Sequence, residues 1–255
     1  MTEKGTQGAI LIFEANVRLV NELMDFDRTV VKFALHHLEQ RQKYLEKAGI
    51  LNQYSSLRSA IDQLRAIREH DSLRSQYRAI LNQGVVLLVS YFGSAVSDLL
   101  SAGIANALGN RQSEALLKKE IKIALEDILN VDPNHEESVA DLVIEKSDIS
   151  FQDMKSISRA FRELLNIEPV KDNHVNNIIV AQACRHLIVH SGGIGDHAFV
   201  NQLRSANPRD LKHDVKKGDS VAFTREEISV VSESMKQYLN RLAKGINEYL
   251  PKVDQ

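Results

Sequence analysis

An arginine and two histidines lie close together near residue 190, in a segment that reads RHLIVHSGG from position 185. On a helix, Arg185, His186 and His190 leave the side opposite to Cys184 and Ile188. Arginine offers a planar fork that suits phosphate oxygens, and histidine transfers protons near neutral pH. The three residues therefore supply a base, an acid and a cation that binds the phosphate, which are the groups that phosphodiester cleavage requires.

Three simpler interpretations apply to the same segment. The cations can be a helix C-terminal cap with a surface salt bridge. His186 and His190 can hold a metal with Asp196 or His197, although the Glu of an HExxH motif is absent. Cys184 can be a nucleophile, but its apolar face favours a small buried thiol. We predict no metal and no cofactor here.

A basic loop follows this segment, in a chain whose net charge is only −2. Residues 197–217 contain only two aspartates, at 210 and 214, but five cations: Arg204, Arg209, Lys212, Lys216 and Lys217. A local basic patch on a nearly neutral protein indicates a polyanionic partner. The alternative is a charged loop that is simply solvated.

Composition limits the class of protein. Of the 255 residues, 43% are hydrophobic and 26% charged, which excludes a disordered chain. One cysteine excludes a disulfide framework and a zinc cluster of several thiolates. The sequence has no uninterrupted apolar run long enough to predict a membrane span, and its N-terminus does not resemble a signal peptide. We expect a soluble cytoplasmic protein without a membrane partner.

Proline scarcity predicts an all-α fold. The four prolines stand at 133, 169, 208 and 251, so the first 132 residues are free of this helix breaker. Apolar spacing of three and four residues predicts the following helices: 9–47, 55–81, 85–108, 112–130, about 135–146, 151–166, 173–191 and 225–249. Residues 203–219 read as irregular, and 220–224 as a short extended piece.

Local signals fix some boundaries. Ser150 is a candidate N-cap of the helix at 151–166, and Thr224 with Glu227 forms a capping box for the last helix. Gln83-Gly84 marks a change from a polar to an almost wholly apolar helix. We therefore divide the chain into an arm at 1–82, a helical domain at 83–250 and a tail at 251–255.

The first two helices are predicted to pair as an antiparallel hairpin, because a short connection makes adjacent helices reverse. A long coiled coil with another chain is the competing interpretation. Asp27 and Arg41 interrupt the apolar stripe of the first helix, and these interruptions favour the hairpin.

The Arg-x4-His motif and its surroundings resemble HEPN-domain proteins, especially bacterial RiboL-PSP-like or related stand-alone ones. The matching residues are Arg185, His186, His190, Gly193, Asp196 and Phe199. The segment VVLLVSYFGSAVSDLL resembles the first core helix of that family, and GDSVAFTREEIS the approach to its last helix. The resemblance covers about 83–250. Gly93 stands where some relatives carry an acidic residue, and Asp98 one turn later is a possible substitute.

The resemblance implies an all-α, HEPN-like bundle that forms a homodimer, in which two Arg-x4-His helices build one cleft. It also implies a metal-independent endoribonuclease that serves as a toxin or an antiphage defence effector. His190 would transfer the proton, Arg185 would hold the phosphate, and His186 would orient the substrate or assist. The 2′-OH of the RNA would attack, giving a 2′,3′-cyclic phosphate and a 5′-OH, and the basic loop would line the RNA path.

Two other functions remain open at the sequence level. The chain can be a non-catalytic helical adaptor that keeps the fold and dimerises, with residues 1–82 binding a nucleotidyltransferase-like or other partner. A cognate antitoxin or a defence-system protein is a further partner that we expect. It can also be a nucleotide-binding regulatory module that uses Arg185 for a phosphate.

Overall fold

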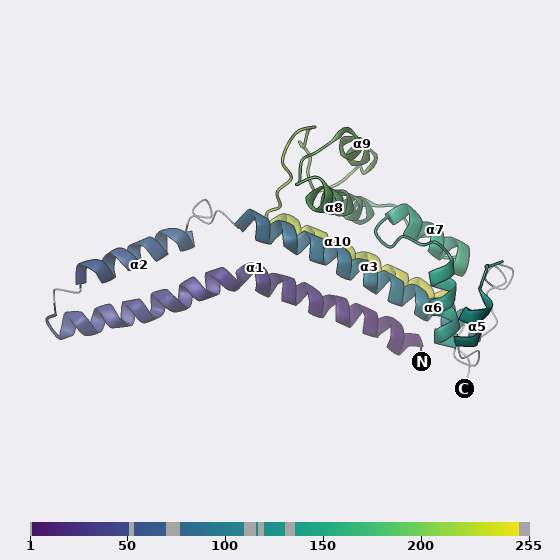
Figure 1. Ribbon diagram of the computed structural model, residues 1–255, viewed down its shortest axis with the longest axis horizontal. Coiled ribbons are helices and arrows are strands. Elements are labelled where there is room, and N and C mark those ends of the chain that lie inside the picture. The colour runs from purple at the N-terminus through teal and green to yellow at the C-terminus, as the bar shows by residue number, and fades with distance from the viewer. Residues whose placement is uncertain are drawn as a thin grey trace.

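The computed structural model describes residues 2–50, 54–69, 77–109, 116, 120–130 and 136–249. Over these residues the chain is a packed bundle of helices without strands, and the predicted all-α class is confirmed. The one extended pairing within them is an isolated antiparallel bridge between Ile194 and Ser220. Figure 1 shows a long bundle from which one end of α1 and the whole of α2 project.

The helices are α1 (Thr2–Lys47), α2 (Tyr54–Glu69), α3 (Tyr77–Gly109), α5 (Leu125–Asn130), α6 (Glu136–Lys146), α7 (Met154–Leu165), α8 (Asn173–His190), α9 (His197–Ser205) and α10 (Arg225–Tyr249). The predicted helices at 135–146, 151–166, 173–191 and 225–249 are confirmed, with small differences at their ends, and those at 9–47 and 85–108 are confirmed but begin seven and eight residues earlier. The prediction of one helix at 55–81 is wrong, because α2 ends at Glu69 and residues 77–81 belong to α3. Helix α9 was not predicted.

Two predicted boundaries are wrong. Helix α3 begins at Tyr77 and runs through Gly84 without a break, so the division at 82/83 falls inside it. A Cβ on Gly84 would lie 3.3 Å from the sulfur of Met24, so this glycine allows α1 to approach α3 closely. The helix expected at 112–130 lies partly outside the described residues, and 120–124 are not helical.

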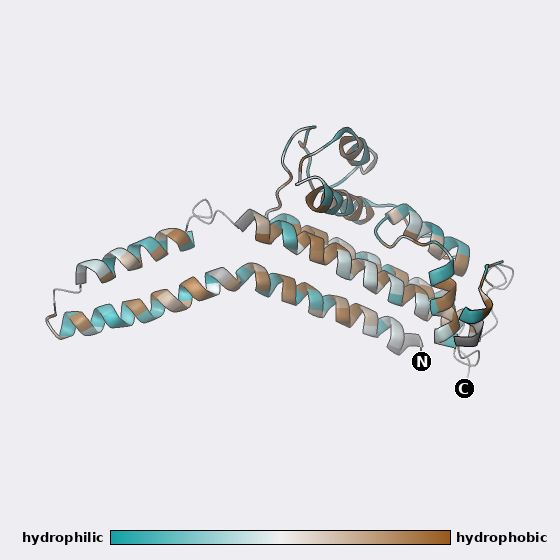
Figure 2. Cartoon of the chain, viewed as in Figure 1, coloured by the Kyte–Doolittle hydropathy of each residue, from teal (hydrophilic) through white to brown (hydrophobic). Residues whose placement is uncertain are grey.

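Helix α3 is the centre of the fold. Helices α1, α6, α7, α8 and α10 all contact it, and its apolar colouring is visible in Figure 2. By length and composition Ala79–Gly109 could cross a membrane, but half of its most apolar window is buried by the rest of the chain. Such a helix is apolar around its circumference because neighbours cover several of its faces.

Helix α1 has two parts with different surroundings. Its first half belongs to the main core, where Ile10, Phe13, Val20 and Met24 are at most 5% exposed. Beyond Met24 it projects with α2, which runs back beside it (Figure 1). Leu35, Leu45 and Ile61 are buried in this projecting part. We call residues 25–69 the arm, which is shorter than the predicted 1–82.

Arg225, the first residue of α10, fixes the point where α1 leaves the core. Its guanidinium donates to the carbonyl oxygen of Met24 at 2.6 Å and pairs with Asp25 at 2.6 Å. A side chain that binds a helix carbonyl competes with the helix's own hydrogen bond and favours a bend. Helix α1 is bent along its length in Figure 1.

The capping predictions have opposite outcomes. Thr224 and Glu227 form the predicted capping box, with Thr224 Oγ1 accepting from Glu227 N at 3.2 Å and Glu227 Oε2 from Thr224 N at 3.0 Å. The prediction for Ser150 is wrong: Asp153 caps α7 by accepting from Ser156 N at 3.0 Å. Residues 150–152 form a turn before the helix, which moves the cap three residues along.

Thr224→Ala is expected to lower the free energy of unfolding by about 1 kcal/mol, because the amide of Glu227 then loses its partner. Urea titration followed by circular dichroism measures this loss. Thr224→Ser keeps the hydroxyl and serves as the control, with a loss well below that of alanine. Equal losses for both variants would mean that the threonine methyl group, and not the cap, stabilises α10.

Candidate functional site

Two glycines shape the chain just beyond His190. The carbonyl of Leu187 accepts from Ser191 N at 2.8 Å and from Gly193 N at 2.9 Å, which ends α8. Gly192 and Gly193 have φ values of 60° and 77°, the left-handed region that glycine enters without strain. The turn therefore needs these glycines for its shape.

The same turn anchors the segment 216–221 beside it. Gly193 O accepts from Val221 N at 2.7 Å, Gly195 N donates to Asp219 O at 3.0 Å, and Gly218 N donates to Gly195 O at 2.8 Å. A Cβ on Gly195 would lie 3.2 Å from Lys216 O, so the two segments pack tightly. The end of the basic loop is thus held next to the end of α8.

Helix α8 presents the three predicted catalytic residues near its C-terminus. The rings of His186 and His190 have their centroids 4.8 Å apart at an interplanar angle of 47°, and both side chains are exposed. Arg185 is half-buried, and its Nε is buried without a hydrogen-bond partner. A guanidinium whose buried nitrogen has no partner can donate to an anion that reaches it.

A small hollow of about 310 Å³ lies beside His186, between α8, α9 and the turn before α7. Gln182 lines it and is 6% exposed; its Oε1 accepts from Met154 N at 3.2 Å, while its buried Nε2 has no partner. Asp196 also lines the hollow and caps α9 by accepting from Phe199 N at 2.8 Å. Gln182 is a candidate site residue that the sequence analysis did not name.

A larger hollow of about 740 Å³ lies between α7, α8 and α9. It shares Asp153 and Gln202 with the smaller one, so the two adjoin. Its lining combines four cations with apolar side chains: Lys155, Arg159, Arg162 and Lys171, with Met154, Pro169, Val175 and Ile179. Cations around an apolar floor suit a ligand that carries both phosphate and a ring.

The sequence analysis missed these four cations. Three of them recur at steps of four and three in the predicted helix 151–166, which places them on one face. From the sequence alone, that spacing indicates a cationic face on this helix. These three cations lie near Lys171 only because α7 and α9 both pack on α8. Lys171 itself donates to Ser205 O at 3.2 Å.

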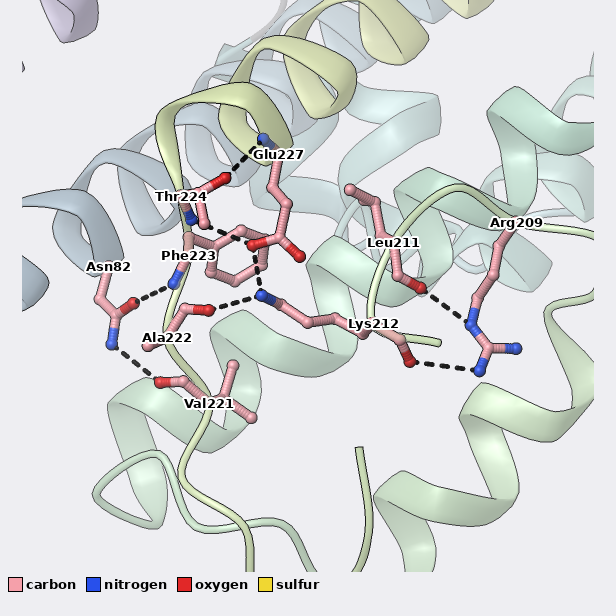
Figure 3. A network of polar contacts seen from close by, with 9 residues as sticks. All are labelled: Asn82, Arg209, Leu211, Lys212, Val221, Ala222, Phe223, Thr224 and Glu227. Carbon is pink, nitrogen blue, oxygen red and sulfur yellow. Dashed lines mark hydrogen bonds and ion pairs between the residues drawn. The ribbon is translucent and has the colours of Figure 1, made fainter. Parts of the chain in front are cut away.

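Arg209, predicted to bind RNA, is a structural residue of its own loop. Its guanidinium donates to four carbonyl oxygens between α9 and residue 212 (Figure 3 shows two of them): Leu203 at 2.8 Å, Ala206 at 3.2 Å, Leu211 at 3.0 Å and Lys212 at 3.3 Å. An arginine that satisfies several carbonyls holds an irregular segment together. Four of its five N–H groups thus already have partners within the loop.

Lys212 points inward and not toward solvent, as Figure 3 shows. Its side chain is 6% exposed, and Nζ lies 2.5 Å from Glu227 Oε2, 2.5 Å from Ala222 O and 4.1 Å from the centre of the Phe223 ring. The burial of a lysine requires such partners. Arg204, Lys216 and Lys217 are exposed, so the predicted five-residue patch has three members at the surface.

The geometry bears on the two alternative chemistries, a metal site and a cysteine nucleophile. Among the residues that the structure describes, no three His, Cys, Asp or Glu side chains gather as a metal site. Cys184 is fully buried, and burial raises the pKa of its thiol to about 12, which makes it unreactive.

Gly93 and Asp98 have different surroundings on α3, since Gly93 packs against Phe151 and Asp98 lies near Asp141. A Cβ at Gly93 would lie 3.3 Å from Phe151 O, so a side chain there would press on the backbone before α7. Burial, together with the nearby Asp141, raises the pKa of Asp98 above its usual range.

Comparisons with protein-family models, with curated proteins and with solved structures found no significant match to this chain. The fold over the described residues is an all-α helical bundle, and a function can be proposed only from the chemistry of the residues that it brings together.

Proposed function

We propose that this chain is a metal-independent endoribonuclease of the HEPN type, acting as a toxin or an antiphage defence effector in the cytoplasm. The observation that carries the proposal is the cluster at the end of α8. There the guanidinium of Arg185 has an unpaired buried nitrogen, and the two exposed histidine rings lie 4.8 Å apart, with His186 lining a hollow.

In the proposed reaction, His190 takes the proton from a ribose 2′-OH, whose oxygen then attacks the adjacent phosphorus. The bond from phosphorus to the 5′-oxygen breaks, and that oxygen takes a proton from a second imidazolium. The products are a 2′,3′-cyclic phosphate and a 5′-OH. Arg185 stabilises the negative charge that develops on the phosphate oxygens, and His186 orients the substrate or assists.

The acid and the base must be separate groups, since one imidazole cannot hold and accept a proton at once. We propose that two copies of α8 meet in a homodimer, so that each phosphate lies between histidines of both chains. The buried Nε2 of Gln182 is available as a further donor toward RNA.

The RNA path includes the larger hollow as well as the surface part of the basic loop. Lys155, Arg159 and Arg162 attract phosphates, and the apolar side chains below them accept a base. Arg204, Lys216 and Lys217 remain as exposed contacts from the original patch. Arg209 and Lys212 are not part of this path.

A second candidate function is the binding of a nucleotide without cleavage. The volume of about 740 Å³, the cations and the apolar floor of the larger hollow favour it. The chain would then be a regulatory module or adaptor, with an antitoxin or another defence protein as partner.

The test is to incubate the purified protein with total RNA in excess EDTA and to identify the ends of the fragments. The proposal expects cleavage that EDTA does not reduce, with 2′,3′-cyclic phosphate and 5′-OH ends. Intact RNA, together with tight binding of ATP or GTP, would favour the nucleotide-binding alternative. Cleavage that requires a metal, or fragments with 5′-phosphate ends, would contradict the mechanism.

Arg159→Ala is expected to weaken RNA binding and to reduce the slope of log K against log salt by roughly 1, because one phosphate contact is lost. Fluorescence anisotropy with a single-stranded RNA over a salt series measures this slope. Lys244→Ala removes an equally solvated cation from α10, 73% exposed, and is the matched control. If both variants keep the wild-type slope, the α7 cations do not contact RNA.

A further inference from the structure

Helix α1 carries a second apolar stripe that no other described part of the chain covers. Six large apolar side chains on it are between 48% and 67% exposed: Ile12, Leu19, Leu23, Phe26, Val30 and Phe33. Their steps of seven, four, three, four and three residues are those of the a and d positions of a coiled-coil heptad. We call these six residues the outer stripe, to distinguish it from the face of α1 that packs on α3.

The heptad spacing identifies the kind of partner, since knobs at these positions fit the holes of another helix. A membrane surface would favour a Lys- and Arg-rich flank. The exposed flank of this stripe instead carries both signs, with Arg18 and Lys32 beside Glu22 and Asp25. Apolar residues recur along the whole of α1 in Figure 2, although only one of its sides lies against α3.

The exposed area is sufficient for a stable pair of chains. Each large apolar side chain presents on the order of 100 Å² at these exposures, so two stripes bury roughly 1,200 Å² in total. That is the lower range of stable protein–protein interfaces. A patch of this size on a protein with a net charge of −2 meets little repulsion from a second copy.

Polar residues within the stripe select one register. Completing the heptad brings Asn16, His37 and Gln40 into the seam as polar members and Tyr44, 70% exposed, as a further apolar one. In an antiparallel pair with Phe26 opposite Val30 of the second copy, Asn16 falls opposite Gln40, Ile12 opposite Tyr44 and Leu19 opposite His37. A register one heptad away would place Asn16 opposite Phe33 or Leu23 opposite Gln40.

Charges beside the stripe agree with the same register. Arg18, Asp25, Lys32 and Glu39 follow one another at seven-residue steps and alternate in sign. In the antiparallel register, Arg18 comes within one residue, about 1.5 Å along the axis, of the level of Glu39 on the second copy. Asp25 is related to Lys32 in the same way. Both carboxylates also pair within their own chain, Glu39 with Arg65 at 2.7 Å and Asp25 with Arg225 at 2.6 Å, so the second copy would add a cation to an existing ion pair. A parallel pair would instead place each charge beside its own like charge.

We infer that two copies of this chain associate through the outer stripes of α1, antiparallel, with Phe26 opposite Val30. This interface lies away from the α8 cluster, because α3 and α10 lie between α1 and α8 in Figure 1 and each contacts both of them. The pairing is therefore independent of the proposed ribonuclease function and leaves both α8 clusters open.

Sedimentation equilibrium of the full chain tests the association. Because the proposed α8 pairing is a separate contact, we expect the wild type to form species larger than a dimer and Phe26→Glu to raise the dissociation constant of the α1 contact by roughly thirtyfold or more, as for a central apolar anchor. A Phe26→Glu chain that associates as the wild type does would overturn the α1 contact and leave the α8 pairing untouched. Phe26 is 66% exposed, so the variant keeps its fold, which circular dichroism checks. Val170→Glu, at a site 70% exposed outside the stripe, is the control and should leave the constant unchanged. A wild type that is monomeric at every soluble concentration overturns the inference.

Cysteine cross-linking tests the register, since the native Cys184 is fully buried. A mixture of Phe26→Cys and Val30→Cys chains with different tags should form mainly mixed disulfide dimers on oxidation. Predominant dimers of each variant with itself would indicate a parallel pair and overturn the proposed register.

Discussion

Changing His190 to alanine is expected to lower the rate of RNA cleavage at least about 100-fold, the usual loss for a catalytic acid or base. The exposed ring faces His186 and covers no part of the core, so its removal leaves the bundle intact. Single-turnover cleavage of a labelled RNA at saturating enzyme measures the chemical step apart from binding. A slowed step with unchanged RNA affinity would identify His190 as a proton-transfer residue.

The matched control is His213→Ala, which removes another exposed histidine from the basic loop and should cleave at the wild-type rate. Arg185→Lys keeps the charge but not the planar fork, and it should lose most of the activity if the phosphate is held by two donors. If His190→Ala cleaves as fast as wild type, the histidine has no part in proton transfer. Expression of each variant in a growing host provides a second readout, because a toxic ribonuclease slows growth.

The second large effect concerns stability. Lys212→Met is expected to reduce the free energy of unfolding by about 3 kcal/mol, because it leaves Glu227 and the Ala222 carbonyl without their partner. Glu227 belongs to the capping box of α10, and the same network reaches α3, where Asn82 bonds both Val221 and Phe223 (Figure 3). The start of α10 is therefore expected to loosen together with the loop.

Urea unfolding compares Lys212→Met with Lys216→Met, whose side chain is exposed and whose loss should be within about 0.5 kcal/mol of zero. The double variant Lys212→Met with Glu227→Gln removes both charges. It should lose less than the sum of the two single losses, because no uncompensated charge remains. Similar stabilities for the variants at 212 and 216 would show that the buried ion pair contributes nothing.

Much of the helix pattern follows from local sequence. The steps of three and four apolar residues identified α8 and the final helix, and the Thr224–Glu227 capping box was correct because its partners are three residues apart. Gln83-Gly84 was interpreted as a boundary between two helices, but Gly84 lies inside α3, where its role depends on Met24, which is distant in sequence. Helix α9 was missed because its signals are short and lie in a polar region.

The candidate site shows the same division. Arg185, His186 and His190 share one short helical stretch, so their spacing alone brought them together. The local sequence does not distinguish Lys212 from Lys216, yet Lys212 is buried in an ion pair and Lys216 is exposed.

The sequence by itself determined the all-α class, most helix positions and the Arg-x4-His cluster, because these depend on hydrogen bonds and side-chain periods within a few residues. Only the tertiary structure decided that α3 is one helix, that Lys155, Arg159 and Lys171 line one hollow, and that the outer stripe of α1 is uncovered. The physical reason is that burial and charge neighbours are set by contacts between elements far apart in sequence. A single helix can satisfy its own backbone, but it cannot specify which of its faces another helix will cover.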